Sequence, residues 1–405
     1  MAHARDLDST LDLLADPYHF ISESAEELGA DVFEARILLE NTLCMRGAAA
    51  ARVFYDESRF SRENAAPEPV LATLFGKGGV QTLDGEAHRA RKAVLLSLLT
   101  PGHVDAMTEL AVRHWDIEAE RDQPGARLLY EYAQRVLTRA ACEWAGLLLS
   151  DMEAESHAED LVRLFDSAAR GIRPHVRARR SRKRLEEGLR GLIESERELP
   201  GSPQAEQTAL RVIATHRQAD GSYLEPNVAA VELLNLLRPT IAVSVYVVWM
   251  AHALQSHPEI AERLRHDAGY VPPFVQEVRR YYPFFPAVVA RVRKDFQWAG
   301  VKFERGQRVL LDLYGTNHDA RIWAEPETFN PERFLQKTPD EYEFVPQGGG
   351  DIQIGHRCPG ENLTIALMQA LLPRLLDALP AIGPHADLSI DAQRLPALPT
   401  RPIKI

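Results

Sequence analysis

The chain has 405 residues, of which 45% are hydrophobic and 26% are charged, and this ordinary globular composition excludes disordered, collagen-like and fibrous proteins. Its 47 basic and 58 acidic residues give a net charge of −11, which is the wrong sign for a protein that binds nucleic-acid phosphates. Three cysteines cannot form a disulfide framework, and the polar start of the chain lacks the apolar core of a signal peptide. We therefore expect a cytoplasmic protein with free thiols and no nucleic-acid partner.

Apolar residues recur at helical spacing along most of the chain. The segments with this pattern and few interior Gly or Pro residues are 94–99, 128–149, 162–172 and 227–254. The last segment has Asn227 as its expected N-cap and Pro258 just beyond its end. Its most apolar part is interrupted by Ser244 and His252 and is too short to span a bilayer. It therefore predicts a buried core helix and no membrane span.

Residues 287–313 have a different pattern, with short alternating runs separated by turn residues. In particular, 296–298 and 301–303 flank Ala299 and Gly300 as the two strands of a hairpin would. We find no flexible linker and no internal repeat. The predicted fold is mainly α with one small β-rich region, in a single domain over 1–405.

A basic run extends from Arg170 to Arg190. It would serve as an anion-binding or nucleic-acid-binding patch, or it is the solvated face of a helix whose arginines are balanced by nearby glutamates. We favour the solvated face, because the whole chain is acidic and no aromatic residues interleave with the arginines.

The segment 346–362 places Cys358 after a glycine-rich loop and just before a predicted helix, 363–376. Backbone N–H groups and a helix N-terminus favour a thiolate over a thiol. Such a thiolate would act as a nucleophile or a metal ligand, and the alternative is an inert buried cysteine. A zinc site is not expected, since no second cysteine lies at ligand spacing.

Glu277 and Arg280 stand three residues apart on one predicted helix face, and Arg333 is a possible third partner. Taken alone, this group predicts a structural ion pair.

In this order, the E-x-x-R pair at Glu277 and Arg280, the P-E-R-F stretch at 331–334 and the cysteine loop resemble the cytochrome P450 superfamily. The resemblance extends from Phe75 to the C-terminus at least. Two positions of the loop depart from the usual pattern: His356 stands where an arginine is usual, and Asp351 replaces a phenylalanine. These departures leave open which residue of the loop contacts a haem propionate.

The resemblance implies haem b, buried between the long central helix and the cysteine loop, with Cys358 as the iron ligand. A thiolate ligand favours cleavage of the O–O bond. His88 and Lys92, four residues apart, would face one propionate together, with Arg62 as a further candidate. The alternative for His88 and Lys92 is an ordinary surface helix face.

Arg238 and Pro239 break two local rules inside the long predicted helix. An interior proline removes one N–H, frees the carbonyl of Asn235, should kink the helix, and costs ~3 kcal/mol or more. A buried arginine among apolar neighbours costs several kcal/mol unless it is paired. Adjacent violations of this kind predict a function, and a buried guanidinium favours a carboxylate partner. Glu232 is poorly placed on the helix for that pairing, although a glutamate from elsewhere in the chain would serve.

The Arg238–Pro239 pair stands where most members of the superfamily carry an acid–alcohol pair. This replacement resembles the fatty-acid peroxygenase family, which includes fatty-acid decarboxylases. The resemblance implies that Arg238 holds the carboxylate of a long-chain fatty acid and that this carboxylate acts as general acid–base. Hydrogen peroxide would replace O₂ and electrons, with no reductase, and hydroxylation would fall at Cα or Cβ.

Three further residues are assigned through the same resemblance. Gln81 stands at the family position above the haem and favours hydroxylation over decarboxylation, or it only fills space. Phe75 and Phe284 would line the substrate pocket, although core aromatic residues would look the same. Two other functions stay open at this point: a conventional reductase-dependent monooxygenase and a non-catalytic haem-binding sensor.

Overall fold

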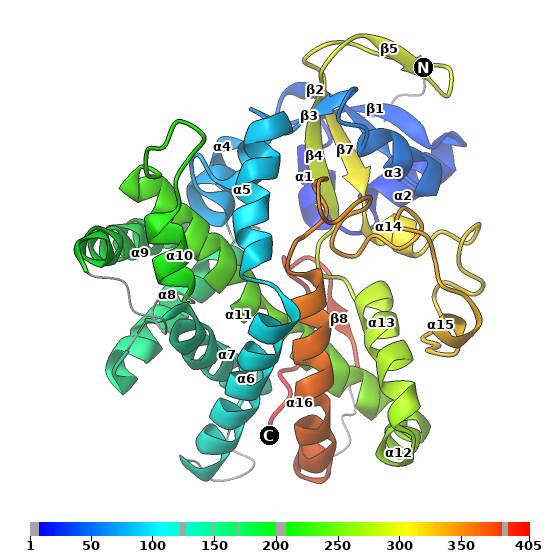
Figure 1. The fold of residues 1–405 in the computed structure, drawn as a ribbon. Coiled ribbons are helices and arrows are strands. Elements are labelled where there is room, and N and C mark those ends of the chain that lie inside the picture. The colour runs from blue at the N-terminus through cyan, green and yellow to red at the C-terminus, as the bar shows by residue number, and fades with distance from the viewer. Residues whose placement is uncertain (1–7, 122–126, 148, 168–170, 200–207, 383–387) are drawn as a thin grey trace.

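The computed structural model describes residues 8–121, 127–147, 149–167, 171–199, 208–382 and 388–405. Most of these residues lie in helices that surround one long helix, α11 (Pro226–Ser256), and a small sheet lies to one side with the N-terminal helices (Figure 1). The predicted fold class, mainly α with a small β-rich region, is confirmed.

Helix α11 forms the core of the molecule. From Ala229 to Leu254 its residues are buried, except for Pro239, which is partly exposed. A helix that is apolar on all sides has to be buried on all sides. By length and composition alone α11 could cross a membrane, but 89% of its most apolar 18-residue window is buried inside the fold, as in the core helix of a soluble protein.

The start of α11 differs from the prediction. Glu225 is the N-cap and Pro226 occupies the first turn, so Asn227 lies inside the helix. Proline is favoured at that first position because its missing N–H would have no partner there. Pro258 does lie just beyond the end, where it begins the next helix, α12 (Pro258–His266). The helix continues through Pro239.

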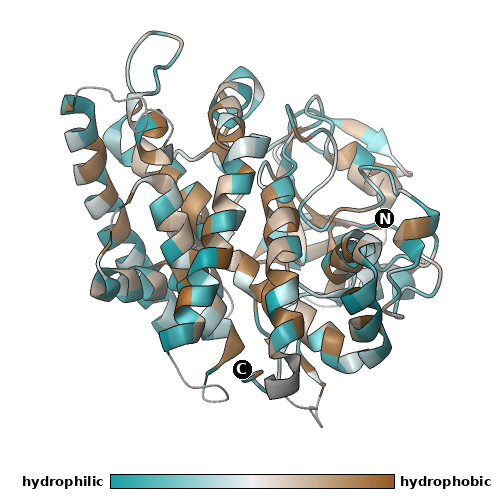
Figure 2. Cartoon of the chain, turned by 60° about the horizontal axis from the view of Figure 1, so that its bottom comes forward, coloured by the Kyte–Doolittle hydropathy of each residue, from teal (hydrophilic) through white to brown (hydrophobic). Residues whose placement is uncertain are grey.

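The helices around α11 are amphipathic: Figure 2 shows hydrophilic and hydrophobic residues along the same outer helices. Those in direct contact with it include α7 (Leu129–Ala145), α8 (Asp151–Asp166), α9 (Ile172–Glu198), α10 (Ala209–Thr215), α13 (Val271–Tyr281) and α16 (Glu361–Ile382). The remaining helical elements are α1 (Thr10–Ala15), α2 (Phe20–Leu28), α3 (Ala48–Phe54), α4 (Glu68–Val70), η1 (Leu71–Phe75), η2 (Val80–Thr82), α5 (Gly85–Ser97), α6 (Pro101–Arg121), η4 (Ala268–Tyr270), α14 (Tyr314–Asn317) and α15 (Arg333–Gln336).

The segment 162–172 was wrongly predicted as one helix: α8 ends at Asp166, α9 begins at Ile172, and 168–170 lie outside the described residues.

The main sheet has the strand order β1-β2-β7-β4-β3. Its strands are β1 (Val32–Ile37), β2 (Glu40–Met45), β3 (Phe60–Ser61), β4 (Ala287–Val292) and β7 (Arg308–Asp312). The two small sheets are β5 (Phe296–Trp298) with β6 (Val301–Phe303), and β8 (Ile390–Asp391) with β9 (Leu398–Pro399). The predicted hairpin at 296–303 is confirmed, with Phe296 opposite Phe303. The hairpin β1–β2 was not predicted, and β2 lies parallel to β7, far away in the sequence.

One arginine of the basic run is not solvated, which corrects the prediction of an exposed face. Arg182 is only 3% exposed, and its Nη1 donates to the carbonyls of Thr73 and Leu74 at 2.9 and 3.2 Å. Its Nε donates to Glu186 at 2.6 Å. The guanidinium lies so close to Gly76, whose φ is +80°, that a Cβ there would overlap Arg182 Nη2. Arg182 therefore ties α9 to the η1 segment that carries Phe75.

A buried carboxyl at the end of β7 makes the stability of the fold dependent on pH. Burial raises the pKa of Asp312 to about 6, although Ser22 and the N–H of Gly315, at 2.7 Å, donate to it. The folded chain therefore holds this proton more tightly than the unfolded chain. The resulting stability is complete below about pH 4 and is lost as the pH rises through about 6.

We expect Asp312→Asn to remove this pH dependence. Relative to the parent chain, the variant should gain stability as the pH rises from about 4 to about 7, by about 3 kcal/mol at the upper end. Thermal unfolding of both proteins across this range measures the difference. A gap between the two melting temperatures that does not change with pH would contradict the assignment.

Candidate active site

The cysteine loop leads into α16, and Cys358 at its end is partly buried. The N–H of Cys358 donates to the carbonyl of Gln347 at 3.0 Å. Burial raises the pKa of the Cys358 thiol, and the N–H of Gly360 together with the charges of Lys92 and Arg279 offsets only part of this rise. This direction is opposite to the one predicted from the backbone N–H groups and the helix N-terminus. A thiolate is thus stable at this position once a cation binds the sulfur, as a metal ion would.

Lys92 reaches from α5 to the cysteine loop. Lys92 is 1% exposed, and its ammonium donates to the carbonyls of Gly355 and Arg357, the latter at 2.7 Å. Burial lowers the pKa of Lys92 to about 8, while the Cys358 sulfur opposes this shift. The structure therefore places two of the three donors of Lys92 on the loop backbone. Lys92 thus anchors the loop, and its predicted pairing with His88 around one propionate stays a prediction.

The guanidinium of Arg62 and the imidazole rings of His88 and His356 gather beside the loop. The two histidine rings stack with centroids 4.0 Å apart, and His88 Nδ1 has no hydrogen-bond partner among the described residues. Burial, and then the neighbouring positive charges, lower the pKa of His88 to about 3, and burial lowers that of His356 to about 4. The guanidinium of Arg62 lies over the Phe54 ring, 4.3 Å from its centroid.

This cluster fits an anion better than a metal cation. Glu57, His88 and His356 place possible ligand atoms within 4.8 Å of one another, but Arg62 and Lys92 add positive charge that repels a metal ion. Carboxylates such as the haem propionates would add to the negative charge of Asp84, whose Oδ1 lies 3.6 Å from His356 Nε2, and they would raise the pKa of both histidines. The residues present therefore fit the haem that the sequence implies.

Arg238 is a further buried cation, and no carboxylate neutralises it among the residues that the structure describes. Its side chain is 7% exposed. Its Nη2 makes one long contact, 3.4 Å to Asn235 Oδ1, and its Nε has no partner. Burial and the charge of Arg182 lower the pKa of Arg238 to about 9, whereas the charge of Cys358 raises it. Helix α11, which carries Arg238, packs against α16, which begins just after Cys358.

A polar chain on α11 leads to Arg238. Arg91 of α5 donates to Glu232 Oε1 at 2.8 Å, and Glu232 Oε2 accepts from Asn235 Nδ2 at 3.2 Å. The same Nδ2 donates to Gln81 Oε1 at 3.0 Å, which brings Gln81 to the turn of α11 just before Arg238. Glu232 is thus occupied by Arg91 and does not neutralise Arg238. The sequence did not reveal this, because Arg91 precedes Glu232 by 141 residues.

The two predicted pocket aromatics are both partly buried. Phe75 ends η1, next to the backbone that Arg182 holds. Phe284 stacks on Tyr246 of α11, with ring centroids 4.6 Å apart. These contacts are compatible with pocket walls and with simple core packing.

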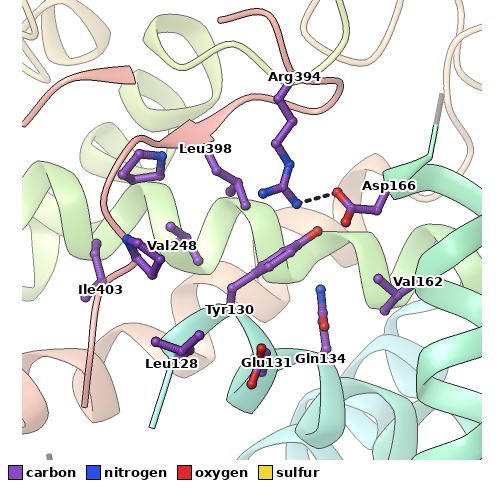
Figure 3. Close-up of a pocket in the computed structure, with 12 residues that line it drawn as sticks. Leu128, Tyr130, Glu131, Gln134, Val162, Asp166, Val248, Arg394, Leu398 and Ile403 are labelled. Atoms are coloured by element: carbon purple, nitrogen blue, oxygen red, sulfur yellow. Dashed lines mark hydrogen bonds and ion pairs between the residues drawn. The ribbon is translucent and has the colours of Figure 1, made fainter. Parts of the chain in front are cut away.

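A cavity of about 280 Å³ lies elsewhere, between α7, α8, α11 and the C-terminal segment (Figure 3). Arg394 and Asp166 form an ion pair in its wall. None of the site residues predicted from the sequence lines this cavity. It is therefore separate from the site built by Cys358 and Arg238.

Comparison with known proteins agrees with this geometry. Residues 243–387 match the cytochrome P450 family model. The structure of cytochrome P450SP alpha (CYP152B1) in complex with (R)-ibuprophen has 45% sequence identity and a TM-score of 0.93, over 98% of each chain. That of cytochrome P450EX alpha (CYP152N1) with myristic acid has 38% identity and a TM-score of 0.91, over 100% of this chain and 98% of the other. Ligand-free cytochrome P450 OleT has 30% identity and a TM-score of 0.91, over 98% and 96%.

Curated relatives match over shorter stretches. Dimethylnonatriene synthase of Arabidopsis thaliana is 34% identical over 112 residues, which are 26% of this chain and 21% of that protein. The full-length matches nevertheless cover the long helix, the E-x-x-R pair and the cysteine loop together. The chain therefore belongs to the cytochrome P450 superfamily, whose haem iron carries a thiolate ligand, and within it to the CYP152 family of fatty-acid peroxygenases.

Proposed function

We propose that this protein is a hydrogen-peroxide-dependent peroxygenase that hydroxylates long-chain fatty acids at Cα or Cβ, with some decarboxylation. The observation that carries the proposal is the buried guanidinium of Arg238, which no described carboxylate neutralises, on the helix that packs against α16 just after Cys358. The proposal takes 1–405 as one catalytic domain of a soluble, cytoplasmic protein that needs no reductase. The similarity to P450EX alpha, whose structure contains myristic acid, and to P450 OleT supports the proposal at the level of the family.

Cys358 would hold the haem iron, and Arg62 and His88 would hold the propionates. His356 would be the residue of the cysteine loop that also contacts a propionate. Lys92 would act one step away, by fixing the loop carbonyls next to Cys358. When bound, haem supplies the oxidising chemistry, which a thiolate ligand favours by promoting O–O cleavage.

Arg238 would bind the fatty-acid carboxylate. A guanidinium offers paired N–H donors that match a carboxylate, and the low polarity around Arg238 strengthens the pair. The carboxylate so held would take a proton from one oxygen of the peroxide and return it to the other, which replaces the missing acid–alcohol pair. Because the head group is fixed, Cα and Cβ would be the carbons nearest the reacting centre.

The neighbouring residues would keep this arrangement in place. Pro239 leaves the carbonyl of Asn235 without its usual helical donor. Asn235 would orient Gln81 and Arg238 together, since it contacts both. Gln81 would favour hydroxylation over decarboxylation, and Phe75 and Phe284 would form part of the pocket wall.

The test is to incubate the purified haem-loaded protein with myristic acid and hydrogen peroxide, without any electron donor, and to identify products by mass spectrometry. We expect mainly α- and β-hydroxymyristic acid. The matched control is 1-tetradecanol, which has the same chain length but no carboxylate and should not be oxidised.

Three outcomes would contradict the proposal or part of it. Product only with a reductase and NADPH would indicate a conventional monooxygenase. A spectral shift with fatty acid but no product would indicate a sensor. A product mixture dominated by the terminal alkene would leave the peroxygenase assignment standing and would refute the role given to Gln81.

A further inference from the structure

Gln347 touches Cys358 twice. Its main-chain carbonyl accepts the N–H of Cys358 at 3.0 Å. Its side-chain Nε2 lies 3.8 Å from Cys358 Sγ and 3.1 Å from Thr364 Oγ1. The side chain of Gln347 is thus within hydrogen-bonding range of the sulfur that would bind iron.

Its neighbours decide which end of the Gln347 amide faces the sulfur. Arg279 Nη2 donates to Gln347 Oε1 at 2.9 Å, and a guanidinium has no acceptor, so the amide oxygen has to face Arg279. The hydroxyl of Thr364 donates to the carbonyl of Gly360 at 3.1 Å, so its oxygen accepts from the amide nitrogen. One hydrogen of the NH₂ group therefore points to Thr364, and the other is left for the sulfur.

Arg279 is itself held firmly. It is 2% exposed, and its Nη2 also donates to Glu361, which is 3% exposed and accepts from Arg357 Nε at 2.6 Å. At the other end, Nη1 donates to Gln276 Oε1 at 2.5 Å. The guanidinium has little freedom to turn, so the orientation it imposes on Gln347 is maintained.

We propose that Gln347 donates an N–H···S hydrogen bond to the haem-binding thiolate of Cys358, and that Arg279 is the positioning residue that keeps the amide in this orientation. A hydrogen bond to sulfur withdraws negative charge from it, and such bonds tune the potential of the metal they surround. The inference rests on Cys358 as the haem ligand. It does not depend on the fatty acid or the oxidant, so it stands or falls separately from the peroxide chemistry.

The test compares Gln347→Leu and Gln347→Glu with the parent haem protein, by its midpoint reduction potential and by the absorption band of the ferrous carbon-monoxide complex. Without the donor, the sulfur should push more charge to iron. We expect a lower midpoint potential and a carbon-monoxide band at longer wavelength in Gln347→Leu. In Gln347→Glu the shifts should be larger in the same directions, since a carboxylate still pairs with Arg279 and places an acceptor near the sulfur.

Two matched variants separate tuning from a general effect on the loop. Gln353 is an exposed glutamine of the same loop, and Gln353→Leu should leave both readouts unchanged. Thr364→Val removes the other contact of the amide nitrogen and should also leave the potential near the parent value. Equal shifts in Gln353→Leu, or parent values in both Gln347 variants at normal haem content, would overturn the proposal.

Gln347→Asn covers the case in which the first two variants bind haem poorly. It keeps an amide for Arg279 but, being one methylene shorter, draws the NH₂ group away from the sulfur. We expect the same directions of shift as in Gln347→Leu. Loss of haem from all three variants would assign Gln347 to folding of the loop and would also overturn the proposal.

Discussion

Arg238→Ala is expected to lower kcat/KM for myristic acid with hydrogen peroxide by roughly 10²–10⁴-fold, the usual contribution of a positioned acid–base group. The variant removes the cation that would bring the substrate carboxylate to the reacting centre. It should fold and bind haem, because Arg238 has no carboxylate partner among the described residues that would be left as an unpaired buried charge. Single-substrate kinetics on haem-loaded protein measure the loss.

Arg238→Lys is the matched comparison. A lysine keeps the charge but binds a carboxylate through one point instead of a planar pair of donors, so its activity should fall between the other two proteins. Spectral titration with myristic acid should show the same order of affinity. If Arg238→Ala keeps the parent rate at normal haem content, the substrate-assisted scheme is wrong.

Glu277→Ala should lower the free energy of unfolding by about 3–5 kcal/mol, the loss typical of breaking a buried ion pair. Glu277 and Arg280 are both fully buried, and Arg280 Nε and Nη2 lie 2.7 and 2.8 Å from the two Glu277 oxygens. Arg333 Nε also donates to Glu277, at 3.2 Å, which confirms the third partner expected from the sequence. Removal of the carboxylate leaves two guanidinium groups without their counter-charge.

Denaturant unfolding of the haem-free proteins measures this loss. The control is Glu304→Ala, which breaks an exposed pair with Lys302 at 2.8 Å and should leave the free energy of unfolding almost unchanged. Similar losses in the two variants would show that the burial of the Glu277–Arg280 pair carries no special weight.

Local pattern was enough to predict the features that lie within one stretch of sequence. The core position of α11, the hairpin at 296–303 and the Glu277–Arg280 pair follow from spacing alone. Arg182 could have been predicted too. It shares the 3.6-residue spacing of Ala178, Leu185 and Leu189, which are buried on the same face of α9, but the density of charge around it concealed that pattern.

The rest depends on partners far away in the sequence. The strand β2 pairs with β7, more than 260 residues later in the sequence, so the residues of β2 alone do not predict its place in the sheet. Nothing near Lys92 in the sequence shows the carbonyls of Gly355 and Arg357 to which it donates. Gln347 is likewise oriented by Arg279, 68 residues away.

The bond from Lys92 to the carbonyl of Arg357 joins positions 265 residues apart, and it bears on how the protein matures. Closing so long a loop is slow and entropically costly, so this contact should form late in folding. A ribosome-bound chain that has been synthesised only as far as α11 already contains Arg62, His88 and Arg238. It still lacks Cys358 and the residues 355–357, to which Lys92 donates. Haem should therefore bind only after nearly the whole polypeptide has left the ribosome. Chains that stall before Cys358 should contain no haem and show no haem absorbance.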